Sequence, residues 1–104
     1  MSAIPQAVFD ADAYKETTRQ QWDKAADAWH RWGPLLSKWL GPATEQMLDM
    51  AGVRPGSRVL DVAAGAGEQT MTVARRIGPD GYVLATDISG TILRFVAQLA
   101  RAEG

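Results

Sequence analysis

The chain of 104 residues carries a formal net charge of −1, with 46% hydrophobic and 22% charged residues. This balance is typical of one small globular domain and excludes a broad basic surface for binding nucleic acid. The chain has no cysteine and one histidine, which excludes disulfides, thiolate metal sites and zinc sites built from several histidines. No apolar run approaches the roughly 18 residues of a membrane span, and we expect a soluble, cytoplasmic protein.

The first half of the chain shows helical spacing. From Asp12 onward, apolar and aromatic residues recur at intervals of three, four and seven, and Asp12 is the expected helix cap. Gly33-Pro34 should end this helix, because proline disfavours helical geometry in the preceding residue, and Pro34 can open a second helix. We expect Gly41-Pro42 to interrupt that second helix before helical spacing resumes.

The second half alternates strands with helices. A short apolar run at 59–63, bounded by turn residues, suits a strand that is buried on both faces. Helical spacing follows over 68–77, with Gly78 as its stop, and a second strand is expected over 82–86. Ser89 can cap a last helix from about residue 90 to 101. This order predicts an α/β fold with a parallel sheet and right-handed crossovers.

The carboxyl ends of the two expected strands carry residues that suit a nucleotide cofactor. Gly65 and Gly67 permit backbone angles and a close approach that a Cβ would block, and they precede a helix with free N–H groups. Asp87, twenty residues beyond Gly67, is placed to accept hydrogen bonds from both ribose hydroxyls. Because open α/β sheets bind ligands at this edge, Arg58 to Asp87 is predicted to be a nucleotide-cofactor half-site.

The same segment resembles a known family. The run LDVAAGAGEQT at 60–70 resembles the first motif of class I S-adenosylmethionine-dependent methyltransferases, in which an acidic residue precedes a Gly-x-Gly-x-Gly pattern. The run TDIS at 86–89 resembles their acidic second-strand motif. VRPGSRVLD at 53–61 and the tryptophan-rich helices are similar to the type named for ubiquinone and menaquinone biosynthesis. The resemblance covers roughly Tyr14 to Ala100, but only the N-terminal half of the family's domain.

The resemblance implies a fold in two parts. Residues 1–52 would form an N-terminal helical cap region, and residues 53–104 the first β-α-β-α half of a Rossmann-like cofactor-binding domain, truncated here. Most groups that bind the substrate would come from the other half. We therefore expect S-adenosylmethionine binding with little or no turnover, a small-molecule methyl acceptor, and open sheet edges that favour self-association.

Position by position, the resemblance implies roles for five residues. Gly65 and Gly67 would shape the loop under the methionine moiety. Asp61 would orient the ammonium group of that moiety, directly or through water. Asp87 would take the ribose hydroxyls, and Ile88 would pack on the adenine.

Three further positions belong to the expected cofactor site. The first glycine of the family pattern is Ala63 here, which puts the closeness of the ligand to that strand end in question. Gln69 could reach the methionine carboxylate or face water. Large aromatic residues at helical spacing favour core packing, but Trp29 is the expected contact if the N-terminal helices cap the cofactor.

Other polar residues suggest no chemistry. His30 lacks a carboxylate partner nearby in the sequence and is expected at the surface or a helix end. Glu45 and Asp49 share one helix face, which we interpret as solvated. No catalytic or metal-binding residue is assigned.

Two other functions compete with the methyltransferase. A nicotinamide- or flavin-binding oxidoreductase half-domain would need Gly-x-Gly-x-x-Gly, but counting from Gly65 places Thr70 in the third glycine position. The third hypothesis is a non-catalytic half-domain that binds a partner or associates with itself.

Overall fold

The computed structural model describes residues 4–5 and 7–104, and this part of the chain has an α/β fold, as predicted. None of the helices described there is long and apolar enough to cross a membrane. Along the chain the elements are α1 (Ala11–Arg31), α2 (Gly33–Met50), β1 (Arg58–Asp61), α3 (Glu68–Ile77), β2 (Tyr82–Ala85) and α4 (Gly90–Glu103).

The cap of helix α1 lies two residues earlier than expected. The side chain of Asp10 accepts a hydrogen bond from the Ala13 N–H at 3.0 Å, so Asp10 is the cap and the prediction for Asp12 is wrong. Asp12 lies in the first turn instead, where its negative charge favours the helix N-terminus. The predicted break between α1 and α2 is confirmed at Trp32, and Pro34 lies in the first turn of α2.

The predicted interruption of α2 at Gly41-Pro42 is wrong, because the helix runs through Pro42. A proline inside a helix forfeits one backbone hydrogen bond and typically costs about 3 kcal/mol. Packing offsets this cost, since Thr44 and Leu48 are buried on the same helix and α2 lies against α3. Burial of the helix face thus overrides the local sequence signal.

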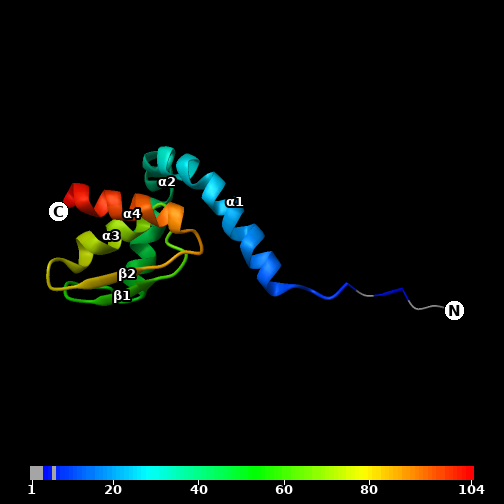
Figure 1. The fold of residues 1–104 in the computed structure, drawn as a ribbon. Coiled ribbons are helices and arrows are strands. Elements are labelled where there is room, and N and C mark those ends of the chain that lie inside the picture. Colours follow the sequence, from blue (N-terminus) through cyan, green and yellow to red (C-terminus); the bar gives the residue numbers. More distant parts are fainter. Residues whose placement is uncertain (1–3, 6) are drawn as a thin grey trace.

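The two strands form a parallel sheet with α3 as the crossover, as predicted. Val59 pairs with Val83 and Leu60 with Leu84. Figure 1 shows the helices gathered on one side of this sheet. The covered face packs Val59 and Val83 against a core of Leu48, Val73 and Ile77.

The expectation that the first strand is buried on both faces is wrong. Leu60 remains 62% exposed and Leu84 48% exposed, and Tyr82 lies on the same open face. The reason is that α3 covers only one face of the sheet. The sheet also has two strands, so both of its edges are open in the part of the chain that the structure describes.

Helix α1 contacts the rest of the fold near its C-terminal end, and its other end projects away from the sheet (Figure 1). Ala26 packs with Ala66 and Ile92, and Phe95 lies against this small cluster. The four tryptophans of α1, α2 and the cap residue between them, expected to favour core packing, are 40–74% exposed. That expectation is wrong because the small Ala26, and not a tryptophan, fills the contact with α4.

Polar side chains fasten α1 to the start of α4. Ser89 caps α4, as predicted, since its Oγ accepts the Ile92 N–H at 3.0 Å. The same hydroxyl donates a hydrogen bond to Asp23 of α1, and Arg19 binds the other oxygen of that carboxylate at 2.9 Å. The Ser89 hydroxyl is the main cause that holds the pKa of the Asp23 carboxyl below its ordinary value, with smaller contributions from Thr91 and Arg19.

Acidification should therefore weaken the junction between α1 and α4. Because the fold lowers the pKa of Asp23, its contribution to stability is present above the ordinary aspartate pKa of about 4 and is lost as the pH falls through the lower folded value. In urea titrations, the difference in unfolding free energy between the wild type and Asp23→Asn should stay constant above that pH and shrink below it. A difference that persists unchanged into strong acid would contradict this assignment.

Candidate cofactor site

A cavity of about 650 Å³ lies at the carboxyl ends of the two strands. One wall comes from α1 and α2, and the opposite wall from the glycine loop (residues 62–67) and the first turns of α3. The tip of β2 supplies the third side. Both the volume and the mostly apolar lining are typical of a small-molecule site. The lining residues are Trp22, Trp29, Leu36, Ser37, Leu40, Gly41, Thr44, Val62, Ala63, Ala64, Gly65, Ala66, Glu68, Gln69, Thr72, Thr86, Asp87, Ile88 and Ile92.

The structure brings most of the expected site residues together around this cavity. Asp61 and Gly67 do not line it. The other six positions do, although they come from α1, the glycine loop, α3 and the tip of β2: Trp29, Ala63, Gly65, Gln69, Asp87 and Ile88.

Asp87 connects the tip of β2 to the glycine loop. Its Oδ2 accepts the N–H of Gly65 at 3.0 Å, and its Oδ1 accepts the N–H of Ser89 at 2.9 Å. A carboxylate has about four acceptor positions, so each oxygen keeps capacity for a further donor. Asp87 is thus a half-buried anion, fixed by two backbone groups, on the wall of the cavity.

Backbone hydrogen bonds hold the glycine loop beside β2. The N–H of Thr86 donates to the Asp61 carbonyl at 2.9 Å, and the N–H of Ala64 donates to the Thr86 carbonyl at 2.8 Å. These bonds continue the parallel pairing past the end of β1. The position of the loop against the sheet is therefore set by the backbone before any ligand binds.

Asp61 faces the interior of the fold. Its Oδ2 accepts a hydrogen bond of 2.6 Å from the hydroxyl of Thr70, which is 1% exposed. The carboxylate thereby joins the end of β1 to the first turn of α3. Its expected role towards an ammonium group stays a prediction.

The two glycines of the loop serve different needs. Gly67 has φ +99°, and an added Cβ would lie 3.0–3.1 Å from Val96, including its Cα, so this glycine lets α3 start against α4. Gly65 has φ +63° and open space where its Cβ would be. Gly67 is therefore required for packing, and Gly65 for the backbone angle at the cavity wall.

The two alanine substitutions should differ in their cost. Gly67→Ala combines backbone strain with a clash against helix backbone and should lower the free energy of unfolding by at least about 2 kcal/mol. Gly65→Ala meets strain alone and should cost about 1 kcal/mol. Urea titration of both variants measures the difference, and equal losses would contradict the distinct roles of the two glycines.

Ala63 adopts a conformation that favours glycine. Its φ is +57°, and among residues 4–5 and 7–104 no other non-glycine residue has a positive φ. An L-residue in the left-handed region carries a strain of roughly 1–2 kcal/mol. The alanine at this position of the motif therefore strains the backbone at the end of β1, in addition to placing a methyl group on the cavity wall.

Ala63→Gly should relieve this strain and raise the free energy of unfolding by about 1 kcal/mol. Ala64→Gly is the matched control, because Ala64 is next in the chain and has no positive φ. The control should lose about 0.4–1 kcal/mol through the greater freedom of its unfolded chain. Chemical denaturation compares the two variants, and a loss of stability in Ala63→Gly would show that Ala63 is not strained.

Helices α2 and α3 meet through Gln69, whose Nε2 donates to the Thr44 hydroxyl oxygen at 3.1 Å. Neither of the two alternatives for Gln69, a contact with the methionine carboxylate or with water, included this bond to Thr44. The residue does line the cavity. On the opposite wall, the rings of Trp22 and Trp29 lie 6.0 Å apart at 48°. Trp29 lines the cavity from α1, as expected if the N-terminal helices cap the site.

Glu68 is a cavity residue that the sequence did not reveal. It is half-buried, and its carboxylate lies against Gly33 at the start of α2, where an added Cβ would be 2.1 Å from Oε1. In the sequence, Glu68 resembles any acidic residue in the first turn of a helix. Its place in the cavity follows from the return of α2 over α3, which local pattern does not encode.

Three polar residues that the sequence assigned to solvent or to a helix end make specific contacts. The ring of His30 stacks on Phe95, with centroids 4.1 Å apart, and its Nδ1 is buried without a partner. Glu45 and Asp49 both bind Arg76 of α3, with Asp49 at 2.7 Å. Both carboxylates remain more than half exposed, as expected for a solvated face, and they also form an ionic contact between α2 and α3.

Comparison with known proteins decides the family. The model of the ubiE/COQ5 methyltransferase family matches residues 38–104, which is more than half of the chain. The chain belongs to the ubiE/COQ5 methyltransferase family. The matched region contains β1, the glycine loop, α3, β2 and α4, so the predicted resemblance to a class I methyltransferase is confirmed for this N-terminal part.

Three curated relatives carry the name ubiquinone/menaquinone biosynthesis C-methyltransferase UbiE. The proteins of Teredinibacter turnerae and Ectopseudomonas mendocina are each 45% identical over 47 residues, which are 45% of this chain and 19% and 18% of the relatives. That of Burkholderia mallei is 52% identical over 44 residues, or 42% of this chain and 18% of the relative. The chain thus matches about a fifth of the length of these relatives. No solved structure matches it.

Proposed function

We propose that this chain forms the S-adenosylmethionine-binding half-site of a small-molecule methyltransferase and has little or no turnover alone. Family membership supports methyltransferase chemistry. The observation that carries the proposal is the meeting of the glycine loop, Asp87 and Ile88 with Trp29 around one cavity. These residues come from separate elements, and the cavity is their common surface.

The fixed carboxylate of Asp87 fits the ribose. Both of its oxygens are already oriented by backbone N–H groups and retain acceptor capacity on the cavity side. Two vicinal hydroxyls can therefore bind without reorganising the loop. Ile88, which is next in the chain and 43% exposed, offers an apolar surface for the adenine beside it.

The methionine end would lie over the glycine loop. S-adenosylmethionine, when bound, supplies an electrophilic methyl group on a positively charged sulfur, together with an ammonium group. Glu68 lines this part of the cavity and makes none of the ion pairs found among residues 4–5 and 7–104. We assign Glu68, in addition to Asp61, to stabilise the positive charge of the cofactor at this end of the cavity. Asp61 is less available for this role, because it already accepts a hydrogen bond from Thr70.

The helices α1 and α2 would cover the bound cofactor. Trp22, Trp29, Leu36 and Leu40 face the glycine loop across the cavity. Their contribution is to exclude water and to hold the cofactor in one orientation, which is the main task of a protein in methyl transfer. The methyl acceptor would be a small molecule.

The described fold supports low turnover and self-association. The relatives extend well beyond the matched segment, so residues outside it can supply the acceptor side of their sites. In this chain the open face of the sheet leaves Leu60, Tyr82 and Leu84 exposed next to unpaired strand edges. Exposed apolar faces and open edges favour association with a second copy.

An oxidoreductase half-site has less support. The third glycine of the dinucleotide fingerprint permits close packing of helix and strand. Thr70 occupies that position, is buried, and uses its hydroxyl to bind Asp61. The helix and strand therefore pack around the Thr70 side chain, whereas the dinucleotide fingerprint needs a glycine at this position.

Calorimetric titration with S-adenosylmethionine, S-adenosylhomocysteine and NAD tests the proposal. The first two should bind saturably and NAD should not. Asp87→Ala removes the acceptor for the ribose hydroxyls and should weaken binding at least about tenfold, since hydrogen bonds to charged groups contribute roughly 1.5–3 kcal/mol. Asp80→Ala, in an exposed turn, is the matched control and should bind like the wild type.

Three results would contradict parts of this proposal. Tight binding of NAD would favour an oxidoreductase half-domain. If none of the three compounds binds, a non-catalytic half-domain is favoured. Methyl transfer to a small acceptor at an ordinary enzymatic rate would show that the chain is not limited to a half-site. Circular dichroism of Asp87→Ala should accompany the titration, because Asp87 also holds Gly65 and Ser89.

A further inference from the structure

We propose that Asp23 of α1 is a positioning residue for the cofactor site: it couples the docking of α1 over the cavity to the orientation of Asp87. This inference rests on the proposed function, since it assigns a role to a residue outside the cavity through its effect on cofactor binding. Asp23 does not line the cavity itself. Its influence passes through Ser89.

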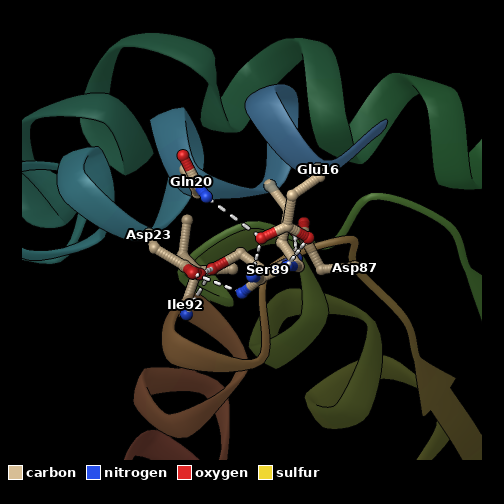
Figure 2. Close-up of polar contacts among 7 residues, drawn as sticks. Glu16, Gln20, Asp23, Asp87, Ser89 and Ile92 are labelled. Atoms are coloured by element: carbon tan, nitrogen blue, oxygen red, sulfur yellow. Dashed lines mark hydrogen bonds and ion pairs between the residues drawn. The ribbon is translucent and has the colours of Figure 1, made fainter. Parts of the chain in front are cut away.

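A continuous series of hydrogen bonds joins α1 to the glycine loop. The Ser89 hydroxyl donates to Asp23, the Ser89 N–H donates to Asp87 at 2.9 Å, and the Gly65 N–H donates to the other oxygen of Asp87 at 3.0 Å. Figure 2 shows Ser89 between the two carboxylates, with Asp23 reaching it from α1. Ser89 is fully buried, so water does not compete at this point.

The hydroxyl of Ser89 has two tasks that depend on one orientation. It accepts the Ile92 N–H at 3.0 Å and thereby caps α4, while it gives its single hydrogen to Asp23. Without the Asp23 acceptor, that hydrogen loses its partner. The backbone of Ser89, which Asp87 binds, then loses one of its restraints.

Asp23 is itself held in place from α1. Arg19 binds it at 2.9 Å and also binds Glu16. Gln20 donates to the same Glu16 at 3.1 Å (Figure 2). A negative charge at the start of α4 is favoured by the partial positive charge of the helix N-terminus. One oxygen of the Asp23 carboxylate therefore accepts the Ser89 hydroxyl, while Arg19 fixes the other oxygen.

The hydrogen bond from Ser89 to Asp23 also holds in place the side chains that α1 contributes to the cavity wall. Trp22, next to Asp23 in the chain, and Trp29, two turns further on, are the side chains that α1 contributes to the lining. Apart from this hydrogen bond, α1 contacts α4 through Ala26, its one buried residue, and through His30 stacked on Phe95. If the bond from Ser89 to Asp23 is lost, α1 loosens, and Trp22 and Trp29 leave the cavity.

The coupling must act in both directions. A ligand that contacts Asp87 and Trp29 together binds the docked arrangement of α1 more tightly than the undocked one. By linkage, the ligand then stabilises docking by the same factor by which docking strengthens binding. A structural role for Asp23 alone would make no such link.

Affinity for S-adenosylhomocysteine provides the first test. Asp23→Ala should weaken binding about five- to tenfold, at the lower end of ordinary coupling between sites. Asp23→Asn keeps an oxygen that accepts from Ser89 and should recover most of this loss. Asp27→Ala, on the same helix, loses only a 3.8 Å contact with Arg31 at the surface and should bind like the wild type.

Hydrogen exchange of the full chain provides the second test. Adding S-adenosylhomocysteine to the wild type should increase protection of the α1 amides, and Asp23→Ala should lose this increase. A purely structural role would lower α1 protection equally with and without the ligand and leave affinity unchanged. The wild-type measurement stands even if Asp23→Ala fails to fold.

The outcomes separate the two proposals. If the wild type binds the ligand but Asp23→Ala binds equally tightly, the coupling is overturned while the proposed function stands. The same holds if ligand binding leaves α1 protection in the wild type unchanged. If the wild type binds neither S-adenosylmethionine nor S-adenosylhomocysteine, both proposals are wrong.

Discussion

The carboxylate of Asp87 holds together the edge of this small fold at which the cavity lies. Its two oxygens accept backbone N–H groups from the glycine loop and from the cap of α4. Without it, Gly65 and Ser89 would each present a backbone donor with no partner, which typically costs about 1–3 kcal/mol per buried group. One anion thereby sets both the shape of the loop and the start of the last helix.

This arrangement is local, which explains how so short a chain carries it. The glycine loop, α3, β2 and the cap of α4 all lie within residues 58–89, and the parallel pairing of β1 with β2 brings their carboxyl ends together. The sheet is nevertheless minimal. With one face of the sheet uncovered, Leu60 and Leu84 contribute little to the core. The hydrogen bonds at the cavity edge are therefore more complete than the apolar packing of the sheet behind them.

The sequence predicted features that depend on local chemistry. Ser89 as a helix cap, Gly78 as the stop of α3, the parallel strands, and Asp87 beside Gly65 follow from turn residues and from the order of strands and helices. The assignments of ligand roles to these residues stay predictions. What is confirmed is their placement and the family.

The features that failed or escaped prediction depend on distant parts of the chain. Pro42 stays helical because α3 covers its helix, and Glu68 lies in the cavity because α2 returns over it. The tryptophans are exposed because an alanine occupies the contact with α4. The bond of Ser89 to Asp23 spans 66 residues, a separation at which no periodic pattern carries information.

That separation also fixes the order in which the site can assemble. Helix α1 is synthesised before its packing partner α4. At ordinary rates of synthesis, roughly 3–13 s pass between Asp23 and Ser89. During this time Trp22 and Trp29 have no cavity to line. The glycine loop, closed by nearby residues, can therefore form before α1 docks and places its two tryptophans on the cavity wall.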